Sequence, residues 1–584
     1  MTHRIAVVEK PKCNPAGCGN LLCIRVCPIN RTGKECIVKG ADSKPVIYEN
    51  MCTGCGICPN RCPFDAISII NLPDELEKEP IHKYGRNGFH LFNLPIPIFG
   101  KVVGILGKNG IGKSTALKIL SGIQKPNFGS EKEAEWGDLI KHFKGTEAQL
   151  YFEKVKEGKI KISYKPQQVE LIPKTAKGTV KELLKKSDET GRLDEIAEKL
   201  DLKKIFENDI TELSGGELQR TAIAATVLKK ANLYVFDEPT SFLDIKQRIR
   251  VANFIKTLAT EETAVLVVEH DLIILDYMTD LIHMIYGKEG VYGVVSHPMT
   301  AKTGINVYLN GYLKDENVRF RDAKIKFEKR QEFREISKEK LTSWSNIHKT
   351  LGKFSVDAKE GETRRKEVVG VLGENGIGKT TFAKILAEEI KPDQGEVEKK
   401  IKVSYKPQYL DSSSNELVLS LLNNALKYEN QLIIPLNITP LLTKQINHLS
   451  GGELQRTAIA LCLSKEADLY LMDEPSAYLD VEQRLVISKI IREFMEMNGK
   501  TAVIIDHDLL FIDYISDRLL VFEGNPAVHG SAKGPFEMAE GMNLFLKDLN
   551  ISFRRDEETK RPRANKIDSQ MDQIQKKENT LYYV

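Results

Sequence analysis

The twelve residues LSGGELQRTAIA occur twice in the chain, at 213–224 and again at 449–460. A serine followed by two glycines at the start of a helix presents backbone N–H groups that can bind phosphate oxygens. Two identical copies of such a string in one chain of 584 residues indicate an internal duplication. The sequence around each copy therefore decides the fold.

Three further strings recur in the same order around both copies. GKNGIGKST (107–115) returns as GENGIGKTT (373–381), KPQ (165–167) as KPQ (406–408), and VFDEPTSFLD (235–244) as LMDEPSAYLD (471–480). The pattern predicts strands before the glycine loop and before DE, and helices after the glycine loop and from LSGGE onward. Each half therefore carries one complete α/β ATPase domain.

The first copy contains an insertion. Its glycine-loop lysine and KPQ glutamine are 54 residues apart, against 29 in the second copy, a difference of 25. The extra residues lie near 130–160 and predict two short helices with a break at Lys144 and Gly145. They carry Trp136, Phe143 and Tyr151 among many lysines. Two interpretations stay open, a surface decoration and a partner-binding arm.

A second repeat lies outside these motifs. GINVYLNGYLKDENVRFRD (304–322) and GMNLFLKDLNISFRRD (541–556) each follow their own copy and predict paired connecting segments. The charged tail after the second has two open interpretations, a disordered segment or a basic strip that docks on a partner. That strip comprises Arg554, Arg555, Arg561 and Arg563.

Nine of the ten cysteines lie between Cys13 and Cys62, and the tenth, Cys462, is expected to be core filler in a helix. In two-cluster ferredoxins the fourth cysteine of each run ligates the cluster that the other run builds. Zinc on the Cys-x2-Cys pairs is the alternative. The ferredoxin rule predicts one [4Fe-4S] cluster on Cys13, Cys18, Cys23 and Cys62, a second on Cys52, Cys55, Cys58 and Cys27, and leaves Cys36 over.

The glycine loops predict two nucleotide sites. Lys113 and Lys379 are expected to reach the outer phosphates, and Ser114 and Thr380 to ligate Mg²⁺. The candidate phosphate-binding residues are Gly107, Asn109, Gly110, Gly112, Lys113, Ser114 and Thr115 in the first copy, and Gly373, Asn375, Gly376, Gly378, Lys379, Thr380 and Thr381 in the second.

The DE pairs end apolar strands and supply the acid chemistry of these sites. Asp237 and Asp473 are placed to hold Mg²⁺ through water. Glu238 and Glu474 are then the candidates for polarising the attacking water. Tyr84, ahead of the first glycine loop, is assigned either to stacking on adenine or to packing.

LSGGELQR matches the signature motif of the ATP-binding-cassette (ABC) family letter for letter. The resemblance implies two cassettes stacked head to tail, with Ser214, Gly215 and Gly216 closing over the ATP that Lys379 holds. Ser450, Gly451 and Gly452 would close over the ATP that Lys113 holds. The same resemblance implies Q-loop residues Gln167 and Gln408, switch histidines His270 and His507, and D-loop residues Asp244 and Asp480.

With its double-cluster N-terminus, tandem cassettes, insertion and hinge-like segments, the chain resembles the RNase L inhibitor family, the E subfamily of ABC proteins. The implied fold class is α/β, with two head-to-tail nucleotide-binding domains and a small α+β ferredoxin-like domain. The implied domains are 1–75 (iron-sulfur), 76–300 (cassette one, insertion about 130–160), 301–322 (hinge 1), 323–540 (cassette two) and 541–584 (hinge 2 and tail).

The resemblance also implies a function, ATP-driven recycling of ribosomes. The family splits ribosomes into large and small subunits after termination and stays on the small subunit, which links recycling to initiation. The implied partners are the small subunit and its rRNA, a termination or rescue factor in the intersubunit space, and initiation factors. The implied state is a monomer with two internal ATP sites, in the cytoplasm and also the nucleus, with ATP, Mg²⁺ and two [4Fe-4S] clusters bound.

Three rival classes of protein are compared with the composition and the motifs. A net charge of +4 and 41% hydrophobic residues describe a globular protein, and we find no apolar run long enough to cross a bilayer and no secretory signal. A transporter ATPase subunit would give the cysteines no task. A redox enzyme coupled to ATP hydrolysis fits the cysteines and predicts oxidation of the clusters during turnover. A DNA-repair ATPase needs a long coiled coil that the insertion cannot supply.

Overall fold

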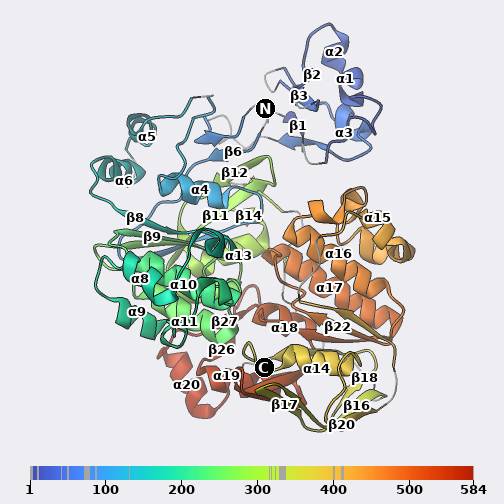
Figure 1. Cartoon of the computed structure of the whole chain (residues 1–584). Helices are drawn as coiled ribbons and strands as arrows, with labels where there is room; N and C mark the ends of the chain where they lie inside the picture. Colours follow the sequence, from blue (N-terminus) through green and yellow to red (C-terminus); the bar gives the residue numbers. More distant parts are fainter. Residues whose placement is uncertain are drawn as a thin grey trace. The chain divides into compact units, whose positions relative to one another are not determined.

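The duplication appears in the structure, a computed structural model, as two large β-sheets of similar strand order (Figure 1). The residues that the structure describes are 4–8, 12–40, 43–48, 51–71, 79–85, 88–130, 132–145, 147–314, 316, 318–321, 324–325, 327, 337, 339–398, 401–408 and 413–582.

The N-terminal residues form a small α+β fold. Its elements are β1 (Arg4–Val8), α1 (Leu22–Val26), α2 (Pro28–Arg31), β2 (Ile37–Lys39), β3 (Pro45–Ile47), α3 (Ile57–Arg61) and β4 (Ile67–Asn71). β1 pairs antiparallel with β4, and β2 with β3. The core between them contains Ala6, Val8 and Ile37 together with several cysteines. The cysteines are thus part of the interior that holds this fold together.

The sheet of the first copy is built around parallel strands. Its strands are β5 (His82–Lys83), β6 (His90–Phe92), β7 (Val102–Leu106), β8 (Ile162–Lys165), β9 (Leu233–Asp237), β10 (Ala264–Val268), β11 (Leu281–Lys288), β12 (Tyr292–Val295) and β13 (Met299–Thr300). The order is β5-β6-β12-β11-β7-β10-β9-β8, with β13 paired to β11. Strands β7, β9 and β10 are buried along their whole length, which explains their continuous apolar sequences. Their parallel direction brings the glycine loop and the DE pair to the same edge of the sheet.

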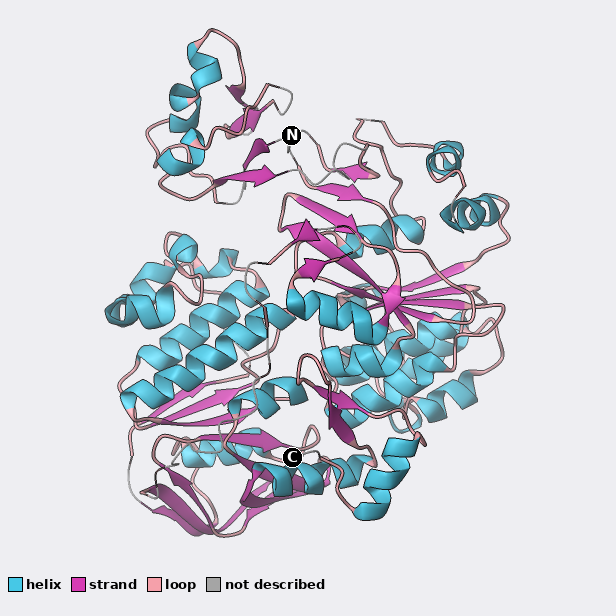
Figure 2. Cartoon of the chain, turned by 180° about the vertical axis from the view of Figure 1, so that it is seen from behind, coloured by secondary structure: helices cyan, strands magenta, loops and turns pink. Residues whose placement is uncertain are grey.

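Helices flank this sheet (Figure 2). They include α4 (Lys113–Leu120), α5 (Trp136–His142), α6 (Glu147–Lys156), α7 (Ile172–Thr175), α8 (Val180–Ser187), α9 (Leu193–Lys199) and α10 (Gly215–Val227). Helices α5 and α6 are the two helices predicted for the insertion. Tyr151 and Phe152 are 5% and 0% exposed and join the core of the first sheet, where Trp136 and Phe143 pack against them. The aromatic residues of the insertion therefore anchor it, and its exposed side chains are several lysines together with acids such as Glu135 and the apolar Leu150.

The second copy repeats the arrangement. Its strands are β16 (Lys340–Leu351), β17 (Phe354–Ala358), β18 (Gly361–Arg364), β19 (Val368–Leu372), β20 (Gln394–Glu398), β21 (Val403–Lys406), β22 (Leu469–Asp473), β23 (Thr501–Ile505), β24 (Arg518–Asn525) and β25 (His529–Glu537). The order is β18-β16-β17-β25-β24-β19-β23-β22-β21, with β20 paired to β16. The parallel segment β19-β23-β22-β21 corresponds to β7-β10-β9-β8.

The helices of the second copy are α14 (Lys379–Leu386), α15 (Val418–Leu421), α16 (Gly451–Ser464), α17 (Val481–Asn498), α18 (Leu509–Ile515) and α19 (Met538–Leu549). Cys462 is 3% exposed on α16, so its prediction as core filler is confirmed. No helix in the described part of the chain is both long enough and apolar enough to span a membrane.

The chain forms two compact units, and the boundary between them runs through the first copy. Two stretches of the first copy belong to the same unit as the second copy. They are residues 240–253, after the DE pair, and residues 270–278, which begin at the switch histidine. These stretches contain the start of α11 (Ile245–Lys256) and all of α12 (Leu272–Met278). The units are residues 1–239, 254–269 and 279–325, and residues 240–253, 270–278 and 326–584.

The two connecting segments are folded. The first contains α13 (Ala301–Asn310), β14 (Tyr312–Leu313) and β15 (Val318–Arg319), and the second continues from α19 into β26 (Phe553–Arg555), β27 (Pro562–Ala564) and α20 (Gln570–Glu578). The disordered interpretation of the tail is therefore wrong for residues 557–582. One of its acids, Asp572, is internal: it accepts from the buried Ser552 hydroxyl at 2.6 Å and from the Asp568 N–H at 3.1 Å, and Ser569 caps the start of α20.

The basic strip proposed for the tail is also wrong. The Arg561 side chain is fully buried and donates to Asp276 on α12 at 3.0 Å, and Arg563 donates twice to the same carboxylate at 2.6 and 3.0 Å. Of the four arginines in that strip, Arg554 alone has an exposed side chain. The sequence could not reveal this because the partner carboxylate lies 285 residues away in the chain.

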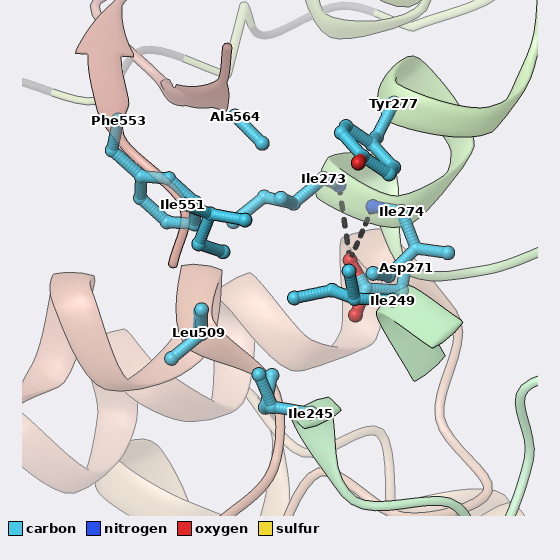
Figure 3. Close-up of a pocket in the computed structure, with 10 residues that line it drawn as sticks. All are labelled: Ile245, Ile249, Asp271, Ile273, Ile274, Tyr277, Leu509, Ile551, Phe553 and Ala564. Carbon is cyan, nitrogen blue, oxygen red and sulfur yellow. Dashed lines mark hydrogen bonds between the residues drawn. The ribbon is translucent and has the colours of Figure 1, made fainter. Parts of the chain in front are cut away.

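Hinge 2 packs on α11 and α12 through apolar side chains (Figure 3). Ile551, Phe553 and Ala564 face Ile273 and Tyr277 around a cavity of about 10 Å³. Such a volume holds no more than about one water molecule. The contact is thus a nearly filled interface, with Asp271 capping α12 through the N–H groups of Ile273 and Ile274 beside it.

Candidate ATPase sites and iron-sulfur centres

Each glycine loop wraps its lysine. The Lys113 Nζ donates to the carbonyls of Gly107 and Lys108 at 2.9 and 2.6 Å, and the Lys379 Nζ to those of Gly373 and Glu374 at 2.8 and 2.6 Å. Burial lowers the pKa of Lys379 to about 8. The loops thus hold the lysines at the N-termini of α4 and α14, where helix dipoles favour phosphate.

The loop glycines are required by close packing. Gly112 and Gly378 both precede the lysine with φ of 94°. A Cβ on Gly112 would lie 2.6 Å from the Phe89 ring, and one on Gly378 would lie 2.9 Å from the Phe354 ring. A side chain at either position would therefore be strained and would push the loop off the sheet.

The predicted magnesium ligands lie together in each copy. The Thr380 hydroxyl donates to Asp473 at 2.6 Å, and Ser114 hydrogen-bonds Asp237. Burial raises the pKa of both aspartates. A hydroxyl beside a buried carboxylate at the end of a glycine loop is a donor set that suits a hard cation such as Mg²⁺.

The Q-loop glutamines hold the candidate catalytic glutamates. Gln167 Nε2 donates to Glu238 Oε1 at 2.8 Å, and Gln408 Nε2 donates to Glu474 Oε1 at 2.7 Å. Burial raises the pKa of Glu474 to about 7, and Asp473 and Asp506 add to the shift. Carboxyls with a pKa near neutrality are suited to general base catalysis.

The switch histidine of the second copy lies beside its glutamate. His507 Nε2 is 3.5 Å from Glu474 Oε1. Burial lowers the pKa of His507 well below its ordinary value, and the cations Lys379 and Arg248 lower it further. The imidazole is therefore neutral at physiological pH. His270, its counterpart, is 7% exposed.

The signature serines cap helices. Ser214 starts α10 and Ser450 starts α16, and each accepts from the N–H of the glutamate three residues on at 3.4 Å. Their hydroxyls donate back to Glu217 and Glu453. Gly215, Gly216, Gly451 and Gly452 fill the first turns of these helices, so their N–H groups lie at positively polarised helix ends.

The first D-loop contacts the second glycine loop within one compact unit. Asp244 Oδ2 accepts from the Asn375 N–H at 3.1 Å, and Lys246 pairs with Glu374 at 2.7 Å. The structure thus brings a residue of the first copy to the phosphate-binding loop of the second. Asp480, the equivalent residue of the second copy, caps α17 through the Gln483 N–H at 2.9 Å.

Tyr84 lies against the first glycine loop. Its hydroxyl is 3.2 Å from the Thr115 hydroxyl and donates to Gln124 at 2.9 Å, and the residue is 44% exposed. Both predicted roles, stacking on adenine and packing, are compatible with this position.

Two lysines were missed by sequence reasoning. Lys165 and Lys406, the first residues of the two KPQ strings, are 0% and 2% exposed and donate to carbonyls at the DE pairs. Burial lowers the pKa of each to about 8. The signal that could have revealed them is their repetition within a nearly identical string, ISYKPQ (162–167) and VSYKPQ (403–408), in both copies.

The cysteines gather in two groups. Cys27, Cys52, Cys55 and Cys58, which come from both runs, line a cavity of about 10 Å³. Cys36 lines it as well and is hydrogen-bonded to Cys27 and Cys52; burial and these neighbours raise its pKa to about 12. Four thiols converging on one cavity from both runs fit the predicted second cluster.

The other group surrounds Cys23. Burial raises the pKa of Cys23 to about 11, with Cys13 and Cys18 as neighbouring charges. The N–H of Ala66 donates to Cys62 Sγ at 3.4 Å, and that of Ala6 to Cys52 Sγ at 3.3 Å. Backbone donors to sulfur stabilise thiolates that ligate iron. None of the ten cysteines, all of which lie in the described part of the chain, forms a disulfide.

Family profiles match most of these regions. The ABC transporter profile matches residues 98–241 and 356–477, the profile described as a possible Fer4-like domain in RNase L inhibitor matches 3–35, and a 4Fe-4S binding domain profile matches 45–68. The two iron-sulfur profiles cover the two cysteine runs of the sequence, and the ABC profile covers glycine loops and DE pairs in both copies.

Relatives match all or most of the chain. The translation initiation factor RLI1 of Saccharomyces cerevisiae is 44% identical, covering 100% of this chain and 98% of the yeast protein. The structure titled as ribosome-bound archaeal Pelota and ABCE1 is 51% identical with a TM-score of 0.94, covering 100% of this chain and 99% of that one. The structure of archaeal ribosomal stalk protein aP1 with the archaeal ribosome recycling factor aABCE1 is 51% identical with a TM-score of 0.84, covering 88% and 100%.

Proposed function

The chain belongs to the RNase L inhibitor family, the E subfamily of ABC proteins, and from this membership we propose that it is an ATP-driven ribosome recycling factor. It is an ABC ATPase, and its N-terminal domain carries [4Fe-4S] clusters. After termination it splits ribosomes into large and small subunits and stays on the small subunit until initiation. The observation that carries the proposal is the match, at a TM-score of 0.94 over the whole chain, to a ribosome-bound relative.

The geometry of each copy supports the following proposed roles for the site residues. Lys113 and Lys379 bind the outer phosphates, and Ser114, Asp237, Thr380 and Asp473 hold Mg²⁺. Glu238 and Glu474 polarise the attacking water. The contacts of Gln408 at 2.7 Å and His507 at 3.5 Å with Glu474 support this assignment. When bound, Mg²⁺ neutralises charge on the transferring phosphate, while these side chains hold the water and its proton acceptor in place.

The two sites are composite. The signature motif starting at Ser214 closes on the ATP of the second glycine loop, and the one starting at Ser450 closes on the ATP of the first. The hydrogen bond between Asp244 and the Asn375 N–H supports this head-to-tail arrangement, because it already joins the first copy to the second loop. Closure on ATP would then bring the two copies together at both sites.

Hinge 2 transmits this closure. The fully buried Arg561 and its neighbour Arg563 grip Asp276 on α12, the helix that starts two residues after the switch histidine His270. In the second copy Asp513, at the equivalent position of α18, accepts from the Tyr582 hydroxyl. Each switch histidine is thus linked through one helix to the C-terminal segment.

In this proposal the iron-sulfur domain is a lever that the two ATPase cassettes move. In our proposal its clusters act mechanically: the domain swings against the space between the ribosomal subunits and separates them. The small subunit is held through rRNA phosphates by the hinges and by the insertion. Exposed lysines on the insertion, among them Lys141, Lys144, Lys154 and Lys156, support that contact.

The partners and location follow from the same proposal. The factor works beside a termination or rescue factor in the intersubunit space, consistent with the Pelota named with its ribosome-bound relative. It passes the small subunit to initiation factors, acts as a monomer with two internal ATP sites, and is cytoplasmic and also nuclear.

Sedimentation of cell extract tests the proposed function. With a nonhydrolysable ATP analogue the cassettes are held closed, so we expect the protein to move with small ribosomal subunits in a sucrose gradient, and without nucleotide to stay near the top. Sedimentation as free protein under both conditions would contradict ribosome binding.

The crosswise ligation of the clusters gives a second test. Replacing Cys62 with serine is expected to disturb the cluster built mainly by Cys13, Cys18 and Cys23, although Cys62 belongs to the other run. Cys36→Ser is the matched control and should leave the iron content unchanged. Iron and sulfide analysis of the purified proteins measures both, and undiminished iron in the Cys62 variant would rule out the crosswise assignment.

A further inference from the structure

A buried lysine lies beside each candidate catalytic glutamate. Lys165 ends β8 and Lys406 ends β21, the strands next to those that carry the DE pairs. Both are almost fully buried, which is rare for lysine and requires hydrogen-bonding partners. None of the roles assigned above uses them.

Their ammonium groups bind main-chain carbonyls of the DE pairs. Lys165 Nζ donates to the carbonyls of Asp237 at 2.9 Å and Glu238 at 3.2 Å. Lys406 Nζ donates to the carbonyls of Asp473 at 2.7 Å and Pro407 at 3.1 Å. The contact with the aspartate carbonyl, which is the peptide bond leading into the glutamate, is therefore the same in both copies.

That peptide bond leads into an unusual backbone. Glu238 and Glu474 have φ of 49° and 48°, in the left-handed region that residues with side chains rarely adopt. Such a conformation persists only where the surroundings impose it, and it is found at functional sites. In both copies the turn directs the glutamate side chain toward the Q-loop glutamine.

The remaining polar groups of the turn are fixed in the same way in both copies. The Glu238 N–H donates to the Val268 carbonyl, and the Glu238 carbonyl accepts from Gln219 of the signature helix at 2.6 Å. In the second copy the partners of Glu474 are the Ile505 carbonyl and Gln455, also at 2.6 Å. The lysine supplies a donor from the Q-loop strand to the main chain of this turn.

We propose that Lys165 and Lys406 are positioning residues that hold each catalytic glutamate in its left-handed turn, so that its carboxylate stays aimed at the attacking water. The same tripeptide then fixes both parts of the glutamate: the lysine holds its backbone and the glutamine two residues on holds its carboxylate. An ammonium group suits this place because its charge also offsets the buried acids around it. The inference rests on the catalytic role proposed above for Glu238 and Glu474.

The test uses full-length protein and measures steady-state ATP hydrolysis and ATP affinity. Lys165→Met/Lys406→Met keeps the volume and removes the donors. Because the glutamate would then leave its productive geometry, we expect kcat to fall about 10²-fold. The KM for ATP should stay within about twofold, since the lysines do not reach the phosphates. Lys165→Gln/Lys406→Gln restores an amide donor and should recover part of the lost kcat.

Two controls make the outcome specific. Lys402→Met removes an exposed lysine just before β21 that pairs with Glu466, and it should have no effect. Glu238→Gln/Glu474→Gln tests the underlying catalytic role separately. If these glutamine variants hydrolyse ATP normally, the proposed catalytic role fails; if they are slow while the methionine variants keep the wild-type kcat, the positioning role alone is overturned. The positioning role would also be overturned if Lys165→Met/Lys406→Met lost kcat and ATP affinity equally. The same holds if the kcat of Lys165→Gln/Lys406→Gln were no higher than that of Lys165→Met/Lys406→Met.

Discussion

Glu238→Gln/Glu474→Gln is expected to bind ATP normally and to hydrolyse it about 10²–10⁴-fold more slowly than the wild-type protein. Glutamine keeps the size of the side chain and its contact with Gln167 or Gln408, but it cannot accept the proton of the attacking water. The closed, ATP-bound state should therefore accumulate. Each single variant should slow hydrolysis at its own site.

Hydrolysis is measured by phosphate release and ATP binding by equilibrium titration on the same preparations. Glu466→Gln, the same chemical change at an exposed position of the second copy, is the control and should behave as wild type. Wild-type rates in both single variants would show that neither glutamate polarises the water.

Deleting residues 1–75 is expected to abolish subunit separation while leaving most of the ATP hydrolysis. Every residue proposed to bind nucleotide lies at or after Tyr84, so both ATP sites stay complete in the truncated protein. The deletion removes only the lever that the cassettes move. The truncated protein should therefore hydrolyse ATP without separating the ribosomal subunits.

The deletion also separates the lever from a redox role. If the clusters transfer electrons, splitting by the full chain should depend on an electron donor and stop when the clusters are held in one oxidation state. Splitting by intact and truncated protein under fixed redox conditions is the measurement. Undiminished splitting by the truncated chain would refute the lever, and donor dependence of the full chain would support the electron carrier.

The sequence predicted which strands and helices carry the ATPase motifs because these motifs are local. A glycine loop, a DE pair and a signature string each fold into a fixed geometry, so contacts such as Gln408 with Glu474 follow once the parallel strands bring them to one edge. The duplication helped, since each position could be checked against its counterpart.

The tail and the lysines could not be predicted because their partners are distant in the chain. Arg561 is one charge among many in a polar segment, and only the fold places Asp276 beside it, 285 residues away. Lys165 likewise looks like a surface residue until β9 brings the Asp237 carbonyl within 2.9 Å. Composition describes such segments by their average, whereas burial depends on one pairing.

The role of the insertion could not be predicted from the sequence either, because the sequence does not show which of its side chains are buried. Its aromatic residues and lysines suggested a partner-binding arm as readily as a decoration. In the structure Tyr151 and Phe152 are buried in the core, with Tyr151 donating to the Leu120 carbonyl, so these two rings do not face a partner. The exposed and buried faces of short helices near the end of a sheet cannot be assigned without knowing what covers them.

Light scattering of purified ribosomes tests the central claim most directly. Ribosomes are mixed with the full-length protein, a termination or rescue factor and ATP, and the scattered intensity reports whether the subunits are joined. We predict a fall in scattering that requires both ATP and the intact iron-sulfur domain. Unchanged scattering with active, cluster-loaded protein would contradict a role in splitting ribosomes.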